Sequence, residues 1–248
     1  HVQKLNFNNK SVESVSFFTG DKLNHAKANK EVILSAGAIG SPHLLQISGI
    51  GDSEKIKNQG IDIVHELKGV GKNLQDHLMF RPVYKLKNIK SLNRDVESLY
   101  SKFLMGLQYI LKQSGPITMG ASQVCAFTKS DPSRATPNLQ FHVQPLSTDI
   151  LGVTPMHNFE GITPTVANIR PTSRGEINIT SNDSRDNPKI KMNYLSTEDD
   201  RIVAAKSLKL VRKIMLETET FKKYQPEEYR PGVHITDDEE LVKAGSDF

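Results

Sequence analysis

The residues best suited to chemistry lie where an apolar run gives way to a helix. Residues 31–37 form a short apolar run that ends in small residues, which predicts a buried, parallel strand ending at a ligand-facing edge. Ser41 then caps the helix and Pro42 opens it, and Gly49 ends it. Such a junction lets backbone N–H groups approach an anionic, nucleotide-like ligand. A closely packed strand-to-helix turn without a ligand is the other interpretation.

Histidines are the next candidates for a functional role. His142 lies in an apolar strand, where a core histidine bonded to the backbone is a sufficient explanation. His157 lies in a loop over residues 149–161 that contains Gly, Pro and His, and long loops inside compact domains are more often functional than structureless. His43 is expected at the surface or near a helix end. The eight histidines show no metal-site spacing, so no metal is expected.

Other reactive residue types are better explained by structure. The chain has a single cysteine, Cys125, which excludes an internal disulfide framework and is expected to be a small buried thiol. Asp76, Asp199 and Asp200 are expected to be structural, and the acidic run over residues 237–240 suits the start of a helix. A turn with a positive side chain at Arg174 is likewise expected to be structural.

Composition sets the broad class. The 248 residues suffice for one large domain or two smaller ones, and 37% hydrophobic with 24% charged residues argues against disorder. The excess of four basic residues is spread along the chain, so no nucleic-acid partner is expected. No run approaches the roughly 20 apolar residues of a spanning helix. No signal peptide is visible, and a cytoplasmic location is the default expectation.

Hydrophobic periodicity predicts a mixed architecture, α/β by class and α+β overall. A hairpin is expected over residues 1–18, followed by a polar turn at 19–24. Helices are expected at 52–59, 92–113 and 199–217, from apolar residues at helical spacing. The remaining strands are expected at 61–66, 124–127, 139–143, 165–169 and 176–179.

Five blocks of sequence together resemble one protein family. Residues 37–51, Gly-Ala-Ile-Gly-Ser-Pro-His-Leu-Leu-Gln-Ile-Ser-Gly-Ile-Gly, match every constrained position of the second signature of the glucose–methanol–choline (GMC) oxidoreductases. Residues 69–77, Gly-Val-Gly-Lys-Asn-Leu-Gln-Asp-His, resemble the segment that leads away from the family's FAD domain. Residues 137–145, 170–175 and 193–195 resemble later blocks in the same order. The chain is similar to bacterial choline- or alcohol-dehydrogenase-like members, over nearly its whole length.

The resemblance implies a division into two parts. Residues 1–78 would be part of a Rossmann-like FAD-binding domain. Residues 79–248 would be a substrate-binding domain, with an antiparallel sheet backed by helices, and the start of the C-terminal GMC region. The family's Gly-x-Gly-x-x-Gly motif does not occur in the sequence, and its catalytic His would lie beyond Phe248. The chain therefore looks like an internal fragment, and we expect no catalytic residue in it and no activity from it alone.

The resemblance also implies a cofactor, FAD, and specific contacts to it. A backbone contact from Val2 to the adenine is expected, because the family has an apolar residue on this strand. His77 would fix its loop near the flavin by hydrogen bonds. In the substrate cavity, His142 and His157 are candidates. The full set of expected cofactor contacts is Val2, Ala36, Gly37, Ser41, Asn73 and His77.

The implied activity is oxidation of an alcohol to a carbonyl, by hydride transfer to flavin while a base takes the hydroxyl proton. Choline or another small primary alcohol is the expected substrate, and the electron acceptor stays open. Membrane association of the parent protein is possible but not indicated by the sequence. Two alternatives remain: a non-catalytic fragment or split-gene product that needs a partner chain, and a hydroxynitrile lyase on the same fold.

Overall fold

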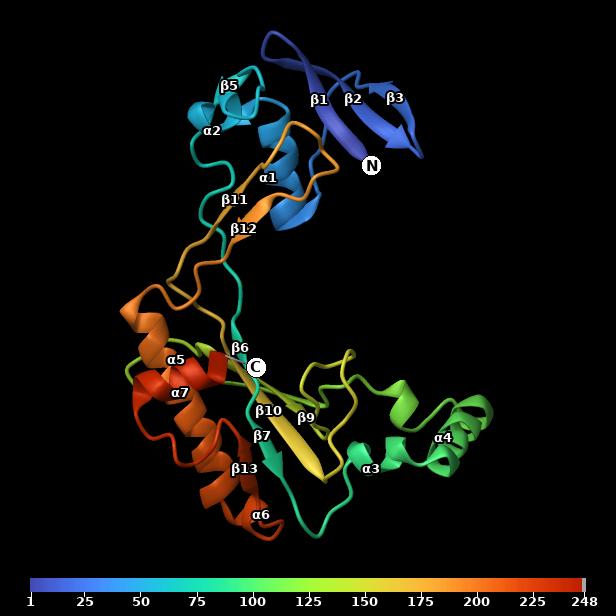
Figure 1. The fold of residues 1–248 in the computed structure, drawn as a ribbon, viewed down its shortest axis with the longest axis vertical. Coiled ribbons are helices and arrows are strands. Elements are labelled where there is room, and N and C mark those ends of the chain that lie inside the picture. Colours follow the sequence, from blue (N-terminus) through green and yellow to red (C-terminus); the bar gives the residue numbers. More distant parts are fainter. Residues whose placement is uncertain (247–248) are drawn as a thin grey trace. The chain divides into compact units, whose positions relative to one another are not determined.

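The computed structural model describes residues 1–246, which form two compact units (Figure 1). The first unit comprises residues 1–76 and 173–196, and the second comprises 77–172 and 197–248, of which 247 and 248 lie outside the described residues. The boundary after residue 76 lies close to the one predicted after residue 78. Residues 173–196 pack with the first unit, a long-range association that the predicted division does not include.

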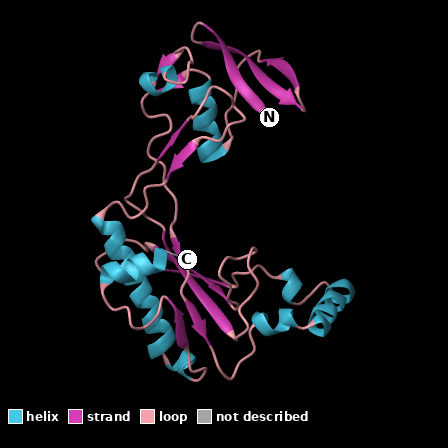
Figure 2. Ribbon diagram, viewed as in Figure 1, coloured by secondary structure: helices cyan, strands magenta, loops and turns pink. Residues whose placement is uncertain are grey.

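The first unit combines a three-stranded antiparallel sheet with two helices and two short ladders (Figure 2). The sheet has the order β1-β2-β3, so the predicted hairpin is confirmed, and the polar turn predicted at 19–24 is present but limited to residues 20 and 21. β2 ends and β3 begins within this range, because Gly20, with a φ of +58°, begins a two-residue turn between them. The elements are β1 (Val2–Asn8), β2 (Ser11–Thr19), β3 (Lys22–Lys27), α1 (Gly37–Ile47), β4 (Ile50–Gly51), α2 (Ser53–Lys57), β5 (His65–Glu66), β11 (Glu176–Asn178) and β12 (Lys189–Lys191).

The predicted buried strand ahead of α1 is wrong. Residues 31–35 carry no strand, and Ile33 is 79% exposed. A parallel strand exists only through its ladder to neighbouring strands, and none of the described strands pairs with this run. The strand predicted at 61–66 is likewise reduced to β5, which pairs in parallel with β4. The predicted helix at 52–59 is present as the shorter α2, with Asp52 as its N-cap.

The second unit is built on a six-stranded antiparallel sheet with the path β13-β7-β10-β9-β8, on which β6 also pairs with β10. The strands predicted at 124–127, 139–143 and 165–169 all correspond to strands of this sheet. Its elements are β6 (Met79–Phe80), β7 (Val83–Lys85), α3 (Leu92–Glu97), α4 (Leu99–Lys112), a 3₁₀ turn (Pro116–Thr118), β8 (Val124–Thr128), β9 (Leu139–Gln144), β10 (Gly161–Asn168), α5 (Glu198–Arg212), a π-helical turn (Lys213–Glu217), α6 (Glu219–Lys222), β13 (Glu227–Arg230) and α7 (Asp238–Ser246).

The core of the second unit lies between one face of this sheet and two helices. Phe80, Phe141 and Val166 are paired in register across β6, β9 and β10, and all three are buried. α5 packs on β10 and on α7 (Figure 1). A Cβ added at Gly245 of α7 would meet Leu208 of α5 and Phe80 at 3.0 Å, so three elements meet at this point. An antiparallel sheet backed by helices is therefore confirmed.

The single helix predicted over 92–113 is two helices in the structure, and the apolar residues at helical spacing belong to the second. Ser98 has an extended conformation, with ψ of 124°, and its Oγ accepts a hydrogen bond from Ser101 N at 3.3 Å, so it ends α3 and caps α4. α4 has no buried residue, and Leu99, Phe103 and Ile110 are strongly exposed. The spacing thus predicts the helix correctly, but not the break within it.

Candidate functional site

The amino-terminal end of α1 is open to a ligand. The N-cap residue is Ala36, whose side chain makes no capping hydrogen bond, and the first turn holds no acidic residue. The free N–H groups of such a turn favour an anion. Residues 36–39 are exposed, and Gly37 has a φ of +79° with empty space where a side chain would begin. An anionic group can therefore approach this backbone closely.

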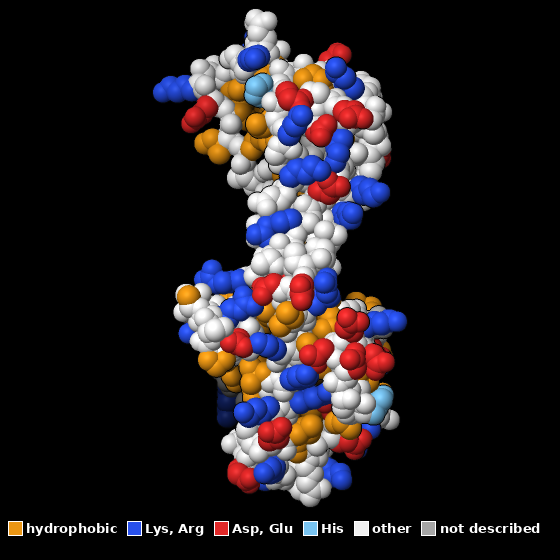
Figure 3. All heavy atoms as spheres, turned by 90° about the vertical axis from the view of Figure 1, so that its left-hand side faces the viewer, with side chains coloured by type: hydrophobic (Ala, Val, Ile, Leu, Met, Phe, Trp, Pro, Cys, Tyr) orange, Lys and Arg blue, Asp and Glu red, His pale blue; other side chains and the backbone are white. Residues whose placement is uncertain are grey.

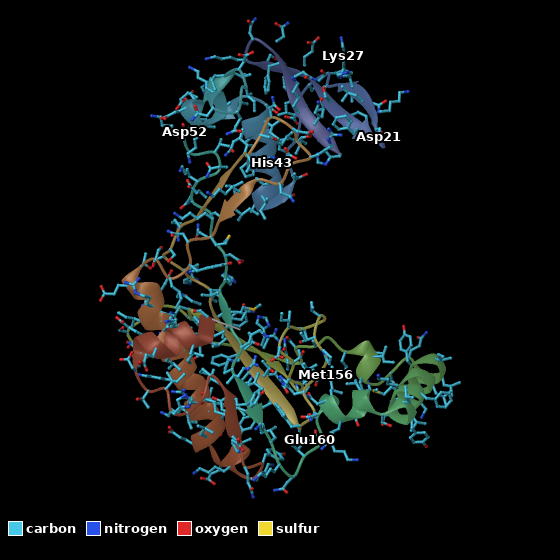
Figure 4. All side chains as sticks on the ribbon, viewed as in Figure 1. Asp21, Lys27, His43, Asp52, Met156 and Glu160 are labelled. Atoms are coloured by element: carbon cyan, nitrogen blue, oxygen red, sulfur yellow. The ribbon has the colours of Figure 1, made fainter. Side chains whose placement is uncertain are left out.

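A hollow of about 330 Å³ lies beside this end of α1. Ala38 and Pro42 of α1 form one part of its wall, residues 71–75 form another, and Ile177 of β11 completes it. The structure thus brings together two sequence blocks that resemble the GMC family and a third segment from far along the chain. His43 lies on the same helix (Figure 4) and is partly buried, which lowers its pKa. It is neither a cap nor a fully exposed residue.

Backbone hydrogen bonds attach the 71–75 segment to β11. Ile177 N donates to Gly71 O at 2.6 Å, and Leu74 and Gly175 exchange two backbone bonds of 3.0 and 2.8 Å. Gly71 has a φ of +80°, and a Cβ there would collide with Ile177 O and with the side-chain Nε2 of Gln46. Only glycine fits this position without strain. One wall of the hollow is therefore fixed by close backbone contact.

Two side-chain contacts also attach residues 73 and 76 to the chain around residues 174–194. Asn73 has a left-handed conformation, with φ of +62°, and its Oδ1 accepts a hydrogen bond from Arg174 Nε at 2.8 Å. Tyr194 donates its hydroxyl proton to Asp76 Oδ2 at 2.6 Å. Burial, and then Asp76, raises the pKa of Tyr194 to about 12. Arg174 and Asp76 therefore have the structural roles expected of them.

Charge at the hollow comes from Lys72, which lines it and is bonded to Glu176. Lys55 Nζ also reaches Glu176 Oε2, at 3.1 Å, and Asn178 Oδ1, at 2.7 Å. Hydrogen bonds from Lys72 and then Lys55 lower the pKa of Glu176 to about 2. The same pairing raises the pKa of Lys72, so its ammonium group stays charged at neutral pH.

The predicted cofactor contacts do not all gather at this hollow. Ser41 is not the N-cap: α1 begins four residues earlier, and Ser41 Oγ instead accepts from Ala36 N at 3.1 Å. Val2 lies on β1 and is absent from the lining of the hollow. His77 is the first residue of the second unit. Ala36, Gly37, Ser41 and Asn73 remain the candidates that lie in or next to the walls.

In the second unit, His142 belongs to a row of side chains on one sheet face. It is paired in register with Cys125 of β8 and Thr165 of β10, so the three side chains point to the same side. Thr165 is 1% exposed, and its Oγ1 has no hydrogen-bond partner among the described residues. Cys125 is exposed at the sheet edge, so the buried thiol predicted from sequence is wrong. The edge strand β8 has a neighbour on one side only, which leaves its side chains uncovered.

His157 is held on both ring nitrogens. Its Nδ1 lies 3.1 Å from Ser147 Oγ and its Nε2 lies 3.2 Å from Asp149 Oδ1, while its ring stacks on Phe159 at 4.8 Å. The hydrogen bond from His157, followed by the charge of Arg230, lowers the pKa of Asp149. A serine, a histidine and an aspartate thus lie in a line, but Ser147 is 0% exposed and cannot attack a substrate. This cluster orders the loop that contains it.

Comparison with known proteins identifies the family of the chain. Family profiles described as GMC oxidoreductase match residues 1–79 and 171–247. The chain belongs to the GMC oxidoreductase family. An "oxygen-dependent choline dehydrogenase" of Photobacterium profundum is 37% identical over 240 residues, and one of Staphylococcus xylosus is 36% identical over 242. These alignments cover 97% and 98% of this chain but 42% of each relative, so the chain spans about two fifths of their length.

Solved structures of GMC-like enzymes share the fold. A formate oxidase has a TM-score of 0.89 at 23% identity, over 100% of this chain and 48% of the other. Pyridoxine 4-oxidase from Mesorbium loti has a TM-score of 0.79 at 21% identity, over 99% and 44%. At this identity the likeness concerns the fold. The predicted mixed fold of helices and antiparallel sheets agrees with these structures.

The family's cofactor is FAD, and the residues around the hollow fit a dinucleotide. The uncapped first turn of α1 suits a phosphate group, and small exposed side chains at 36–38 leave its backbone accessible.

Within residues 1–246 no group of three His, Cys, Asp or Glu side chains could hold a metal ion. None of the helices described over this range is long and apolar enough to cross a bilayer. On the face drawn in Figure 3, basic and acidic side chains are intermixed.

Sequence reasoning missed three residues that build the hollow. Gln46, Lys72 and Glu176 connect α1, the 71–75 segment and β11. Of the three, only Gln46 could have been identified from the sequence. It is an amide within the otherwise apolar run from Leu44 to Ile47, and a buried amide needs hydrogen-bond partners. The pairing of Lys72 with Glu176 spans more than 100 residues of sequence, and no local pattern indicates it.

Proposed function

We propose that this chain supplies one wall of an FAD site and the substrate-domain sheet of a GMC-type alcohol oxidoreductase. The observation that carries the proposal is the hollow of about 330 Å³ between the uncapped end of α1 and residues 71–75. Most of its wall comes from residues 37–51 and 69–77, two blocks that resemble the GMC family. Ala36, Gly37, Ser41 and Asn73 are the proposed cofactor contacts in or next to the walls of the hollow. Val2 and His77 remain proposed contacts outside these walls.

When bound, FAD supplies the hydride acceptor for oxidation of an alcohol carbon to a carbonyl. The residues of this chain would bind the cofactor and the substrate and orient them. The N–H groups of the first turn of α1 would hold a phosphate oxygen. In the second unit, His142 on β9 and His157 in the loop before β10 are the proposed substrate-cavity residues. His142 has the freer side chain, because both ring nitrogens of His157 are engaged. Choline or another small primary alcohol is the proposed substrate, by similarity to the choline dehydrogenases.

A charge placed at the open helix end tests the site. Ala38→Glu puts a carboxylate in the first turn of α1, where it favours the helix dipole and so does not threaten folding, but repels an anionic ligand. Ala26→Glu, on the exposed strand β3, is the control with the same change of charge. In a titration of FAD followed by fluorescence polarisation, we expect Ala38→Glu to weaken binding at least about tenfold and the control to change it by less than about twofold. Equal affinities for the two variants would refute the site.

The reaction itself needs a separate assay. With the flavin-loaded protein, reduction of an electron-accepting dye by choline is set against release of cyanide from a hydroxynitrile. Dye reduction supports alcohol oxidation, and cyanide release without dye reduction supports the lyase alternative.

A further inference from the structure

The side chain of Gln46 takes the place of a neighbouring strand at the free edge of β11. Gln46 is 5% exposed. Its Nε2 donates to Ile177 O at 2.9 Å, and its Oε1 accepts from Ile179 N at 2.9 Å. The C=O of one residue and the N–H of the residue two positions on are the pair that an adjacent strand would engage. One side-chain amide therefore closes an edge that β12, on the other side of β11, leaves open.

This amide acts together with the backbone of the 71–75 segment. Gly71 O takes the N–H of Ile177, and Gln46 takes the C=O of the same residue. Gln46 Nε2 also lies 3.4 Å from Val70 O. The outer edge of β11 is thus shared between a helix side chain and a loop backbone, and each restricts the other. A change at Gln46 is therefore transmitted to Gly71 through the backbone of Ile177.

The elements joined in this way are the walls of the hollow. Gln46 lies two turns along α1 from Ala38, which lines one side, and the other side begins at Gly71. The spacing of the two walls is therefore set by one amide that is both donor and acceptor. Methionine has a similar volume but would leave Ile177 O and Ile179 N buried without partners, which is costly.

We propose that Gln46 is a positioning residue for the cofactor site: it holds the open end of α1 at a fixed distance from residues 71–75, so that the site is preorganised for FAD. This inference rests on the proposed function. Preorganisation raises affinity because less order is lost on binding. Coupling between two sites is reciprocal, so bound FAD must stabilise the Gln46 contacts by the factor that those contacts contribute to binding.

The first measurement compares variants of the chain. Gln46→Met removes both hydrogen bonds at similar volume, and Gln59→Met is the matched control, on a glutamine of the same unit that is only partly buried. By polarisation titration we expect Gln46→Met to weaken FAD binding about tenfold, and the control to weaken it less than about twofold. Unchanged affinity in Gln46→Met, with binding intact in the unmodified chain, overturns the positioning role alone. No binding by the unmodified chain overturns the proposed function and the positioning role together.

The second measurement needs no variant, which covers the case in which Gln46→Met does not fold. Hydrogen exchange of the Ile179 amide, whose acceptor is Gln46 Oε1, is recorded with and without saturating FAD. We expect exchange at Ile179 to slow about tenfold when FAD is bound, by the reciprocity of the coupling. The reference is the backbone amide of Val143 in the second unit, which lies on the central strand β9 between β8 and β10 and should not change. Equal exchange rates at Ile179 with and without FAD overturn the positioning role.

Discussion

Replacing Gly71 by alanine tests how the wall of the hollow is built. Gly71 has a φ of +80°, and an added Cβ would strike Ile177 O, a backbone atom, and the Nε2 of Gln46. Gly60 has a similar φ of +71° and nothing within 4 Å of the added Cβ. Both positions belong to the first unit. Both variants therefore place an alanine in the left-handed region, but only in Gly71→Ala does the added Cβ also collide with neighbouring atoms.

The expected magnitudes follow from two contributions. An alanine in the left-handed region costs about 1–2 kcal/mol, and this applies to both variants. Overpacking against atoms that cannot withdraw adds about 1–3 kcal/mol, and this applies to Gly71→Ala alone. The free energy of unfolding should fall by about 1–2 kcal/mol in Gly60→Ala and by about 2–5 kcal/mol in Gly71→Ala.

Urea unfolding followed by circular dichroism gives the overall stability. Because the chain forms two units, hydrogen exchange at the Ile177 amide, which donates to Gly71 O, reports on the first unit by itself. If Gly71→Ala is no more destabilising than Gly60→Ala, the contact between the 71–75 segment and β11 is not as close as described, and the wall of the hollow is misplaced.

Three further outcomes are expected. Arg212→Met should lower the free energy of unfolding by about 3–5 kcal/mol in urea melts, because Glu228, whose side chain is 0% exposed, loses its two 2.9 Å bonds from this guanidinium; a loss below about 1 kcal/mol would contradict it. The pKa of Glu176 is lowered to about 2, so the ionised carboxylate stabilises the fold fully above the ordinary pKa of a glutamate, and this stabilisation is lost as the pH falls towards 2. Glu176→Gln should therefore flatten the dependence of the free energy of unfolding on pH between about pH 5 and pH 2. Parallel curves for the variant and the unmodified chain would contradict this. Cys125 should react with a disulfide reagent in the folded chain, one thiol per chain, and protection until denaturation would contradict its exposure.

Periodicity predicts the elements whose partners lie close in sequence or whose apolar stripe is continuous. The hairpin of β1 and β2 and the strands β8 and β9 follow from alternation, and α5 from its stripe and from Thr197, which caps it by accepting from Asp200 N. These features are local, so the sequence alone contains them.

The errors arise where structure depends on distant neighbours. The run at 31–35 has the composition of a buried strand, but a strand forms only beside a partner. Ser41 has the residue type of an N-cap, yet Gly37 with its positive φ allows α1 to start earlier. Cys125 is apolar in type, but its strand is at the edge of the sheet.

In the candidate site, too, some features could be predicted from the sequence and others could not. The residues at the junction before α1 and in the 69–77 segment could be identified by their types and by family resemblance. That the two segments face one hollow could not, because the contact depends on β11, which lies 131 residues after Gln46 at its point of contact. Gln46 is an example of both cases. The sequence shows its amide within an apolar run, but only the structure shows that its hydrogen-bond partners are Ile177 and Ile179.

The central claim is that a dinucleotide binds between the start of α1 and the segment after β5. The most direct test is to titrate the isotopically labelled chain with FAD at millimolar concentrations and to follow its backbone amides by NMR. We expect the amides of residues 37–39 and 71–73 to shift together along one binding curve. Shifts confined to other residues, or no shifts at all, would contradict the claim.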